Sequence, residues 1–195
     1  MQECEGIMGD EPVRKFFLKQ FKVISHAIST YEDLTLLIKH LSEGTSRTFE
    51  AKGCSILLLD ERENELFHVS SYGISEEYLK KGPIMIDDKY SAFVRGEPVY
   101  IEDMRSDLRA HYQEAAKKEG IVSMLSIPIK YRNVSIGLIR IYLGEQRGFN
   151  EDDVEALGIL AEHLGLVIEN NGMKNFIEKI KMAMESLPLR MLEGL

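Results

Sequence analysis

One segment of the chain, residues 121–129, is apolar on both faces of the β-strand that it predicts. Four side chains share one face at the strand period of two: Ile121, Leu125, Ile127 and Ile129. Three more share the other face: Val122, Met124 and Pro128. Antiparallel strands commonly leave one face to water, so a strand of this composition must lie in a sheet that is covered on both sides.

Segments at both ends of the chain carry apolar residues at helical spacing and can cover one face of that sheet. Residues 10–28 predict a first helix, and residues 30–49 predict a second. A third helix is predicted from Asn150, an N-cap residue followed by three acids, to Pro188. Its apolar stripe shifts phase at residues 170–172, and we expect one continuous helix with a weak point there.

The other face of the sheet must be covered by the middle of the chain. Two hairpins are predicted, residues 54–72 and 121–143, each with a short polar turn. Between them the pattern predicts only short elements: a helix near 76–80, a strand near 84–86, a helix near 90–95, a strand near 99–102 and a polar helix over 108–118. A sheet roofed by irregular chain is a place where a ligand pocket is expected.

Composition excludes several classes of function. The chain has 195 residues and a formal net charge of −8, so it offers no basic stripe for a nucleic acid. No apolar run approaches the roughly 20 residues that span a bilayer, and the acidic start is unlike a signal peptide. Cys4 and Cys54 form no metal motif, and none is formed by His26, His40, His68, His111 and His163. We expect a cytoplasmic protein without metal, membrane or nucleic-acid partner.

Short motifs follow one another along most of the chain. They are Gly53–Asp60, Ser71–Gly73, Arg95–Asp103, Ser126–Ile129, Ile136–Ile139, Phe149–Asp153 and Leu160–Asn170. Their order and spacing resemble GAF domains over residues 30–172. The resemblance implies an α+β, profilin-like fold, in which a central antiparallel sheet has terminal helices on one face and a pocket of loops and short helices on the other. Residues 1–29 would be an N-terminal helix and residues 173–195 a C-terminal helical extension.

The resemblance also implies a ligand set and a class of function. It places Met124, Ser126, Leu138, Arg140 and Tyr142 on the pocket side of the central strands, with Ser55 and Leu57 on the first strand and Tyr112 in the roof. GAF domains are small-molecule sensors and dimerisation modules in signal transduction. We expect a sensor that passes its signal to another protein, or alternatively a ligand-free scaffold whose roof is filled by Tyr112, Tyr142 and Met124. The cofactor, the ligand and the downstream protein are unknown from the sequence.

Arg140 lies within an apolar run, and its guanidinium has three possible environments. An acid of the roof, Asp87, Asp88 or Glu102, can pair with it. A small anionic ligand can bind its planar fork. The third alternative is exposure to water. A guanidinium that is buried without a partner is excluded from the alternatives, because its burial is unfavourable in free energy. The pair Asp87-Asp88 itself is either an N-cap of the helix near Tyr90 or, as in phytochromes, a ligand contact.

Three specialised forms of the family lack support in the sequence. Free methionine-(R)-sulfoxide reductases place redox cysteines around the pocket, whereas residues 123–128 hold none and Cys54 is expected on the helix-covered face. A covalently bound bilin needs a cysteine at the pocket rim, and neither thiol fits. The cyclic-nucleotide pattern is incomplete, because Val154 stands where an acid is required. We therefore expect a protein that is not an enzyme.

The C-terminal extension carries an apolar stripe beyond the body of the domain: Met173, Phe176, Ile177, Ile180, Met184 and Leu187. A stripe at spacings of three and four outside a core usually contacts a partner helix. We expect a homodimer through the terminal helices. The alternative is packing of this stripe against the first helix of the same chain.

Overall fold

The computed structural model describes residues 34–86 and 88–185. In chain order the elements are α2 (Leu34–Thr48), β1 (Gly53–Asp60), β2 (Glu65–Tyr72), α3 (Glu76–Leu79), β3 (Ile84–Met85), α4 (Ala92–Arg95), β4 (Val99–Ile101), α5 (Gln113–Glu119), β5 (Ser123–Tyr131), β6 (Val134–Leu143) and α6 (Glu151–Glu185). Within these ranges no helix is both long enough and apolar enough to cross a bilayer. The predicted helix over residues 10–28 lies outside the described residues.

The strands form a six-stranded antiparallel sheet in the order β3-β2-β1-β6-β5-β4. The β5–β6 hairpin turns at Arg132 and Asn133, which both take positive φ angles, as a two-residue hairpin turn requires. This pairing sets Ser126 opposite Arg140 and Met124 opposite Tyr142. Both predicted hairpins are confirmed, and β1 pairs with β6 at the centre of the sheet.

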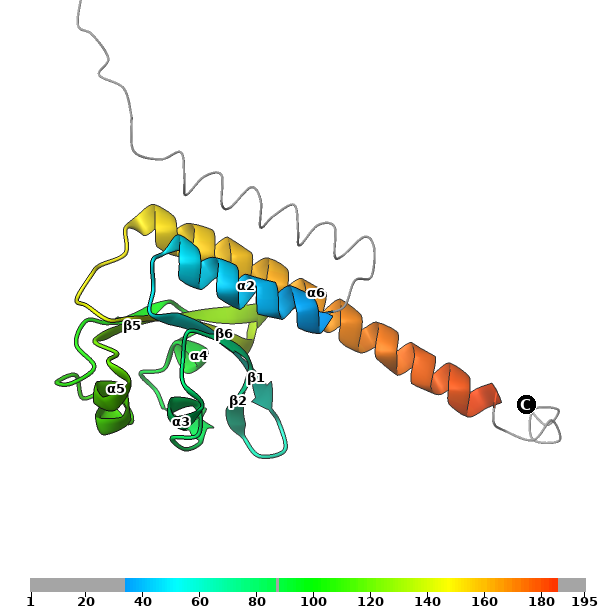
Figure 1. Ribbon diagram of the computed structural model, residues 1–195. Coiled ribbons are helices and arrows are strands. Elements are labelled where there is room, and N and C mark those ends of the chain that lie inside the picture. Colours follow the sequence, from blue (N-terminus) through cyan, green and yellow to red (C-terminus); the bar gives the residue numbers. More distant parts are fainter. Residues whose placement is uncertain (1–33, 87, 186–195) are drawn as a thin grey trace, which may run out of the picture.

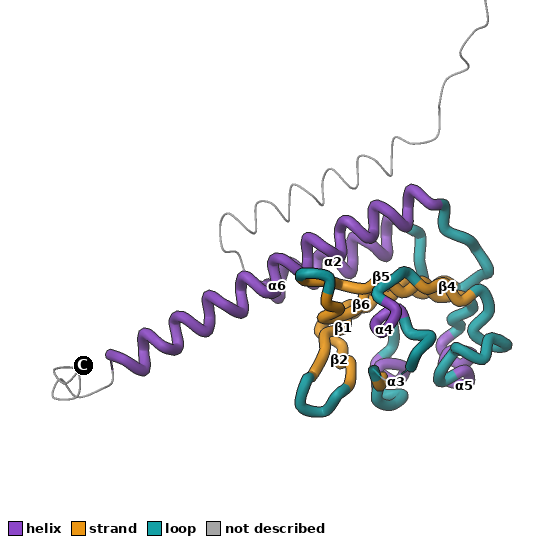
Figure 2. The backbone as a smooth tube through the Cα atoms, turned by 180° about the vertical axis from the view of Figure 1, so that it is seen from behind, coloured by secondary structure: helices purple, strands orange, loops and turns teal. Residues whose placement is uncertain are grey.

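Helices α2 and α6 lie side by side over one face of the sheet (Figures 1 and 2). The core between them is largely apolar and includes Cys54 and Ile56 from β1, Ile127 from β5, and Leu157 and Leu164 from α6. The Asn150 side chain accepts a hydrogen bond from the Asp153 backbone N–H at 2.7 Å, which confirms the predicted N-cap. Helix α6 continues without a break through residues 170–172 and projects beyond the sheet (Figure 1).

The opposite face is covered by the chain between β2 and β5 (Figure 2). We call this cover the roof: the described residues of 73–122 outside strands β3 and β4, with helices α3, α4 and α5. Two separate apolar clusters lie beneath it. One contains Tyr78, Met124 and Tyr142, and the other contains Leu57, Phe93 and Leu138. The prediction of a sheet with an irregular cover on its second face is confirmed.

Three local predictions are wrong. Helix α5 begins at Gln113 and not near Leu108, because the Asp107 carboxylate accepts the Arg109 backbone N–H at 2.9 Å and turns the chain there. Ile121 precedes β5 and packs in the roof, on the side of Met124. Helix α4 is capped by Ser91, whose hydroxyl accepts a hydrogen bond from the Phe93 N–H, and not by Asp88.

Candidate functional site

A cavity of about 200 Å³ lies between the sheet and the roof. Its floor comes from β4, β5 and β6, and its cover comes from the roof segments before and after α4. Its apolar lining includes Ile84, Ala92, Val99, Ile101, Met104 and Met124. The polar and aromatic lining includes Tyr78, Lys81, Asp88, Arg109, His111, Tyr112, Ser126 and Arg140.

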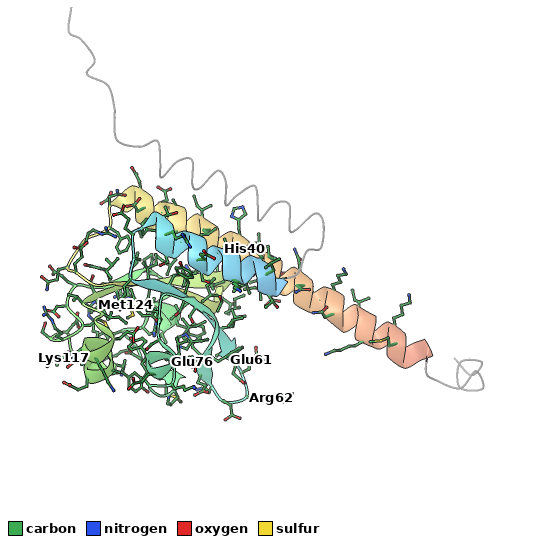
Figure 3. The ribbon with its side chains drawn as sticks, viewed as in Figure 1. His40, Glu61, Arg62, Glu76, Lys117 and Met124 are labelled. Atoms are coloured by element: carbon green, nitrogen blue, oxygen red, sulfur yellow. The ribbon has the colours of Figure 1, made fainter. Side chains whose placement is uncertain are left out.

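The floor is positioned by strand register. Ser126 and Met124 alternate onto the roof face of β5, and Arg140 stands opposite Ser126 on β6. In Figure 3 Met124 lies at the sheet, below the two long helices. Ser55 of β1 is the other cross-strand neighbour of Arg140, so one guanidinium is flanked by two buried serines.

Tyr112 closes the cavity from the roof. Its backbone has a φ of +59°, an uncommon conformation for a residue with a side chain, and its hydroxyl donates a hydrogen bond to the Pro83 carbonyl at 2.6 Å. Gly82 lies beneath the ring, where an added Cβ would approach the Tyr112 hydroxyl to 2.7 Å. Two stretches of the roof, around Pro83 and Tyr112, are therefore joined over the cavity.

Some of the charged groups that line the cavity are paired with an opposite charge, and others are not. Arg109 pairs with Asp107, with a shortest contact of 2.5 Å, and Asp88 accepts from His111 at 3.1 Å. Lys81 lies over the Tyr78 ring, 4.0 Å from its centroid, and donates to the Tyr78 carbonyl at 3.3 Å. Burial, and secondly the nearby Arg140 charge, lower the pKa of Lys81 to about 8.

Four of the eight predicted ligand residues line the cavity: Tyr112, Met124, Ser126 and Arg140. The other four do not. Leu57 and Leu138 pack against Phe93 beneath α4, Tyr142 is fully buried against Tyr78 with ring centroids 5.7 Å apart, and Ser55 is fully buried in β1. All four face the roof as expected, and the contact of any of the eight with a ligand stays a prediction.

Several lining residues were not predicted from the sequence, among them the charged Lys81 and Arg109. Lys81 is the one without a carboxylate partner among the described residues. It follows α3 in a Lys-Lys-Gly-Pro stretch, where no hydrophobic period assigns a side chain to a face. The glycine and proline after it mark a turn, which was the one available signal that this lysine bends back over the sheet.

Arg140 has no acidic partner among the described residues, and its predicted contact with an anionic ligand stays a prediction. Asp88 pairs with His111, and Glu102 is exposed, so among the described residues neither acid neutralises Arg140. Asp87 lies outside the described residues. Arg140 is partly buried, and its Nε atom is buried without a hydrogen-bond partner.

Comparison with known families identifies the fold. The sequence profile described as GAF domain matches residues 32–169, well over half of the chain. The chain belongs to the GAF domain family. Comparison with curated protein sequences found no match.

Solved GAF domains share the fold at low identity. The GAF domain of the Acinetobacter phosphoenolpyruvate-protein phosphotransferase is 22% identical with a TM-score of 0.66, over 80% of this chain and 94% of that chain. The corresponding domain from Coxiella burnetii is 20% identical with a TM-score of 0.70, over 83% and 97%. The free methionine-R-sulfoxide reductase of Neisseria meningitidis, solved with its substrate, is 18% identical with a TM-score of 0.67, over 87% and 96%.

Cys54 of this GAF domain lies away from the cavity. It packs with Ile56 on the helix-covered face and is fully buried, as predicted. Burial raises the pKa of its thiol to about 12, which disfavours the reactive thiolate. Among the described residues no group of three His, Cys, Asp or Glu side chains is placed to hold a metal ion.

Proposed function

We propose that this GAF domain is a cytoplasmic small-molecule sensor without catalytic activity. The ligand occupies the cavity between the sheet and the roof, and a second protein reads the change. The observation that carries this proposal is the cavity itself, which is enclosed by Tyr112 above and by Met124 and Arg140 below. Family membership supports it, because GAF domains are common in signal-transduction sensors.

The cavity also favours a sensor over the ligand-free scaffold. A scaffold requires Tyr112, Tyr142 and Met124 to fill the space beneath the roof. Tyr142 packs against Tyr78 instead, while Tyr112 and Met124 line an open volume. Protein interiors are close-packed, so an unfilled cavity between sheet and roof that combines apolar lining with a few charged groups is better explained by a ligand than by structural need.

The fold offers a route from the cavity to the long helix. Met124 and Ser126 of β5 line the cavity, and the intervening Leu125 and Ile127 pack against α6 from the other face. Gly165 of α6 lies so close to β5 that an added Cβ would come within 2.1 Å of the Lys130 carbonyl oxygen. A shift of β5 on ligand binding would therefore displace α6, and signalling requires a coupling free energy of about 1–3 kcal/mol.

A thermal-shift screen with a metabolite panel tests the sensor. A ligand that binds the folded state raises the Tm. Val99→Phe is designed to fill the cavity and should abolish that rise, while Val134→Phe on the exposed hairpin should preserve it. A panel without any binder would favour the scaffold, and an unchanged response of Val99→Phe would place the ligand elsewhere.

The absence of catalysis is tested directly with methionine sulfoxide and a thiol reductant. We expect no turnover, because the described thiol is buried on the helix side of the sheet. Turnover by the wild-type chain that survives Cys54→Ala would contradict this part of the proposal.

A second role, homodimerisation through α6, is favoured by the pattern of exposed residues on that helix. Ile159, Leu166, Met173 and Ile180 recur every seven residues and are 43% to 49% exposed. At about 100° per residue this stripe lies opposite the side of α6 that packs on the sheet. Such a repeat is the seam of a coiled coil, and we infer that a second copy of this chain covers it.

Charge placement agrees with a parallel pair of α6 helices. With the stripe at the d positions, the a positions between them are taken by His163, Asn170 and Ile177. Glu169 takes a g position and Lys174 the following e position. Parallel coiled coils bring g and e residues of opposite charge together. A buried Asn at an a position additionally fixes the register of two strands.

Sedimentation of full-length variants tests the dimer. Ile177→Glu with Ile180→Glu should convert dimer to monomer, because four acidic side chains would meet in the seam. The control Asn175→Glu lies at an exposed f position and should remain dimeric. A chain truncated after Asn171 that is still dimeric would exclude the extension from the interface.

A further inference from the structure

Two cations face the cavity without a carboxylate partner among the described residues. Of the charged groups that line it, Arg109 is neutralised by Asp107, and Asp88 is engaged by His111. Arg140 and Lys81 remain, one rising from β6 and the other descending from the roof after α3. Ions of like sign held near each other in a partly buried space destabilise the ligand-free domain.

The polar groups around Arg140 are unsatisfied as well. Its Nε, the Ser55 hydroxyl and the Tyr142 hydroxyl are buried, and none of the three atoms has a hydrogen-bond partner of acceptable geometry. Burial raises the pKa of the Tyr142 phenol, and the adjoining Arg140 and Ser55 oppose that rise, so the three groups are neighbours. Buried donors are nearly always satisfied in folded proteins, which indicates that an acceptor belongs here.

Lys81 presents the complementary half of the site. Its ammonium nitrogen lies 4.0 Å from the ring centroid of Tyr78 and 6.0 Å from that of Tyr112. It is therefore placed between two aromatic rings of the cavity wall. Only one hydrogen bond, to the Tyr78 carbonyl, is made by its three donors among the described residues.

We propose that the cavity selects a small organic anion whose carboxylate or phosphate oxygens bind both Arg140 and Lys81. This inference rests on the proposed sensor function and adds the ligand class to it. The apolar body of the ligand lies against Ile101, Met104 and Met124. A volume of about 200 Å³ equals that of roughly seven waters, so the ligand is a molecule of the size of a short dicarboxylate or a phosphorylated triol.

Matched pairs of probes test the ligand class by calorimetry on the full-length chain. Succinate is compared with succinamide, glutarate with glutaramide, and glycerol phosphate with glycerol. We expect at least one anion to bind and its uncharged counterpart to bind at least tenfold more weakly. The pair that responds distinguishes a carboxylate ligand from a phosphorylated one.

Four variants test which residues contact the anion. Arg140→Met and Lys81→Met should each weaken the bound anion by about 10- to 100-fold, the usual loss for a hydrogen bond to a charged group. Arg132→Met removes an equal charge from the exposed hairpin turn and should change affinity less than twofold. Asp87→Asn should not weaken binding. A stronger anion response in Asp87→Asn, together with no loss in Arg140→Met, would show that Asp87 already satisfies Arg140 and would overturn the proposal.

The outcomes separate the two proposals. A neutral member that binds as well as its anion, with the response lost in Val99→Phe, would overturn the anionic ligand and leave the sensor intact. If no probe binds, anionic or uncharged, and the metabolite panel also gives no response, both the anionic ligand and the sensor function are overturned.

Discussion

The two faces of the sheet are covered in different ways, and the difference separates stability from binding. On the helix side one continuous apolar core joins α2, the sheet and α6, and the buried Ser42 is satisfied by Ser70 at 2.8 Å and by the Lys39 carbonyl at 2.9 Å. On the roof side the core is divided in two, and Ser55, His68 and Arg140 hold buried polar atoms without partners. The helix side packs as one apolar core, whereas the roof side keeps buried polar groups without hydrogen-bond partners, the groups that the proposed ligand would satisfy.

The largest expected contrast is between two core isoleucines. Ile127→Ala on the helix side should lower the free energy of unfolding by about 3 kcal/mol, because the solid packing cannot collapse into the space. Ile101→Ala borders the existing cavity, loses fewer contacts and should cost about 2 kcal/mol or less. Urea unfolding of both variants measures the difference. Equal costs would mean that the roof is packed as tightly as the helix layer.

Arg140→Met should raise the free energy of unfolding, whereas the two isoleucine substitutions lower it. In the ligand-free domain it removes a partly buried charge that no described acid neutralises, so we expect unfolding to become harder by about 1 kcal/mol. Urea unfolding without ligand gives this value. Destabilisation by several kcal/mol would instead indicate that Arg140 has an acidic partner in the folded state.

His68 should make the roof face sensitive to acid. Leu57 is its cross-strand partner, so the ring faces the roof, and burial, followed by the charges of Lys81 and Arg140, lowers its pKa to about 4. The unfolded chain binds a proton at about pH 6.5, so it holds more protons than the folded chain between these values. Stability should therefore fall as the pH is lowered from about 6.5 towards 4.

The loss attributable to His68 is about 1 kcal/mol, because the ring is only partly buried and solvent screening reduces the effect. Thermal unfolding across this pH range should show a shallower acid slope in His68→Leu than in the wild type. The exposed His40, which stands on the outer side of α2 in Figure 3, provides the control His40→Gln. A control that flattens the slope as much as His68→Leu would assign the acid sensitivity to another group.

The sequence was sufficient to predict both covers of the sheet but not the shape of the space between them. The family resemblance correctly placed Met124, Ser126 and Arg140 on the roof face of the sheet, where the strand period of two keeps them together. The same period could not show that Leu57 and Leu138 lie under α4 while Ser126 lies under open space. That depends on where the roof is hollow, which is decided by turns such as those at Asp107 and Tyr112. Lys81 was missed for the same reason, since loop side chains follow no period.

The smallest expected effects come from two substitutions that each remove one hydroxyl, one on each face of the sheet. Ser42→Ala breaks two hydrogen bonds on the helix side and leaves the Ser70 hydroxyl without that partner, so it should destabilise the domain by roughly 1 kcal/mol. Ser55→Ala removes a buried hydroxyl that has no aligned partner, and its cost should lie within about 0.5 kcal/mol of zero. Chemical unfolding resolves such a difference when both variants are measured together. If Ser55→Ala costs as much as Ser42→Ala, its hydroxyl is already satisfied without a ligand, and the polar groups around Arg140 form a closed network instead of an open site.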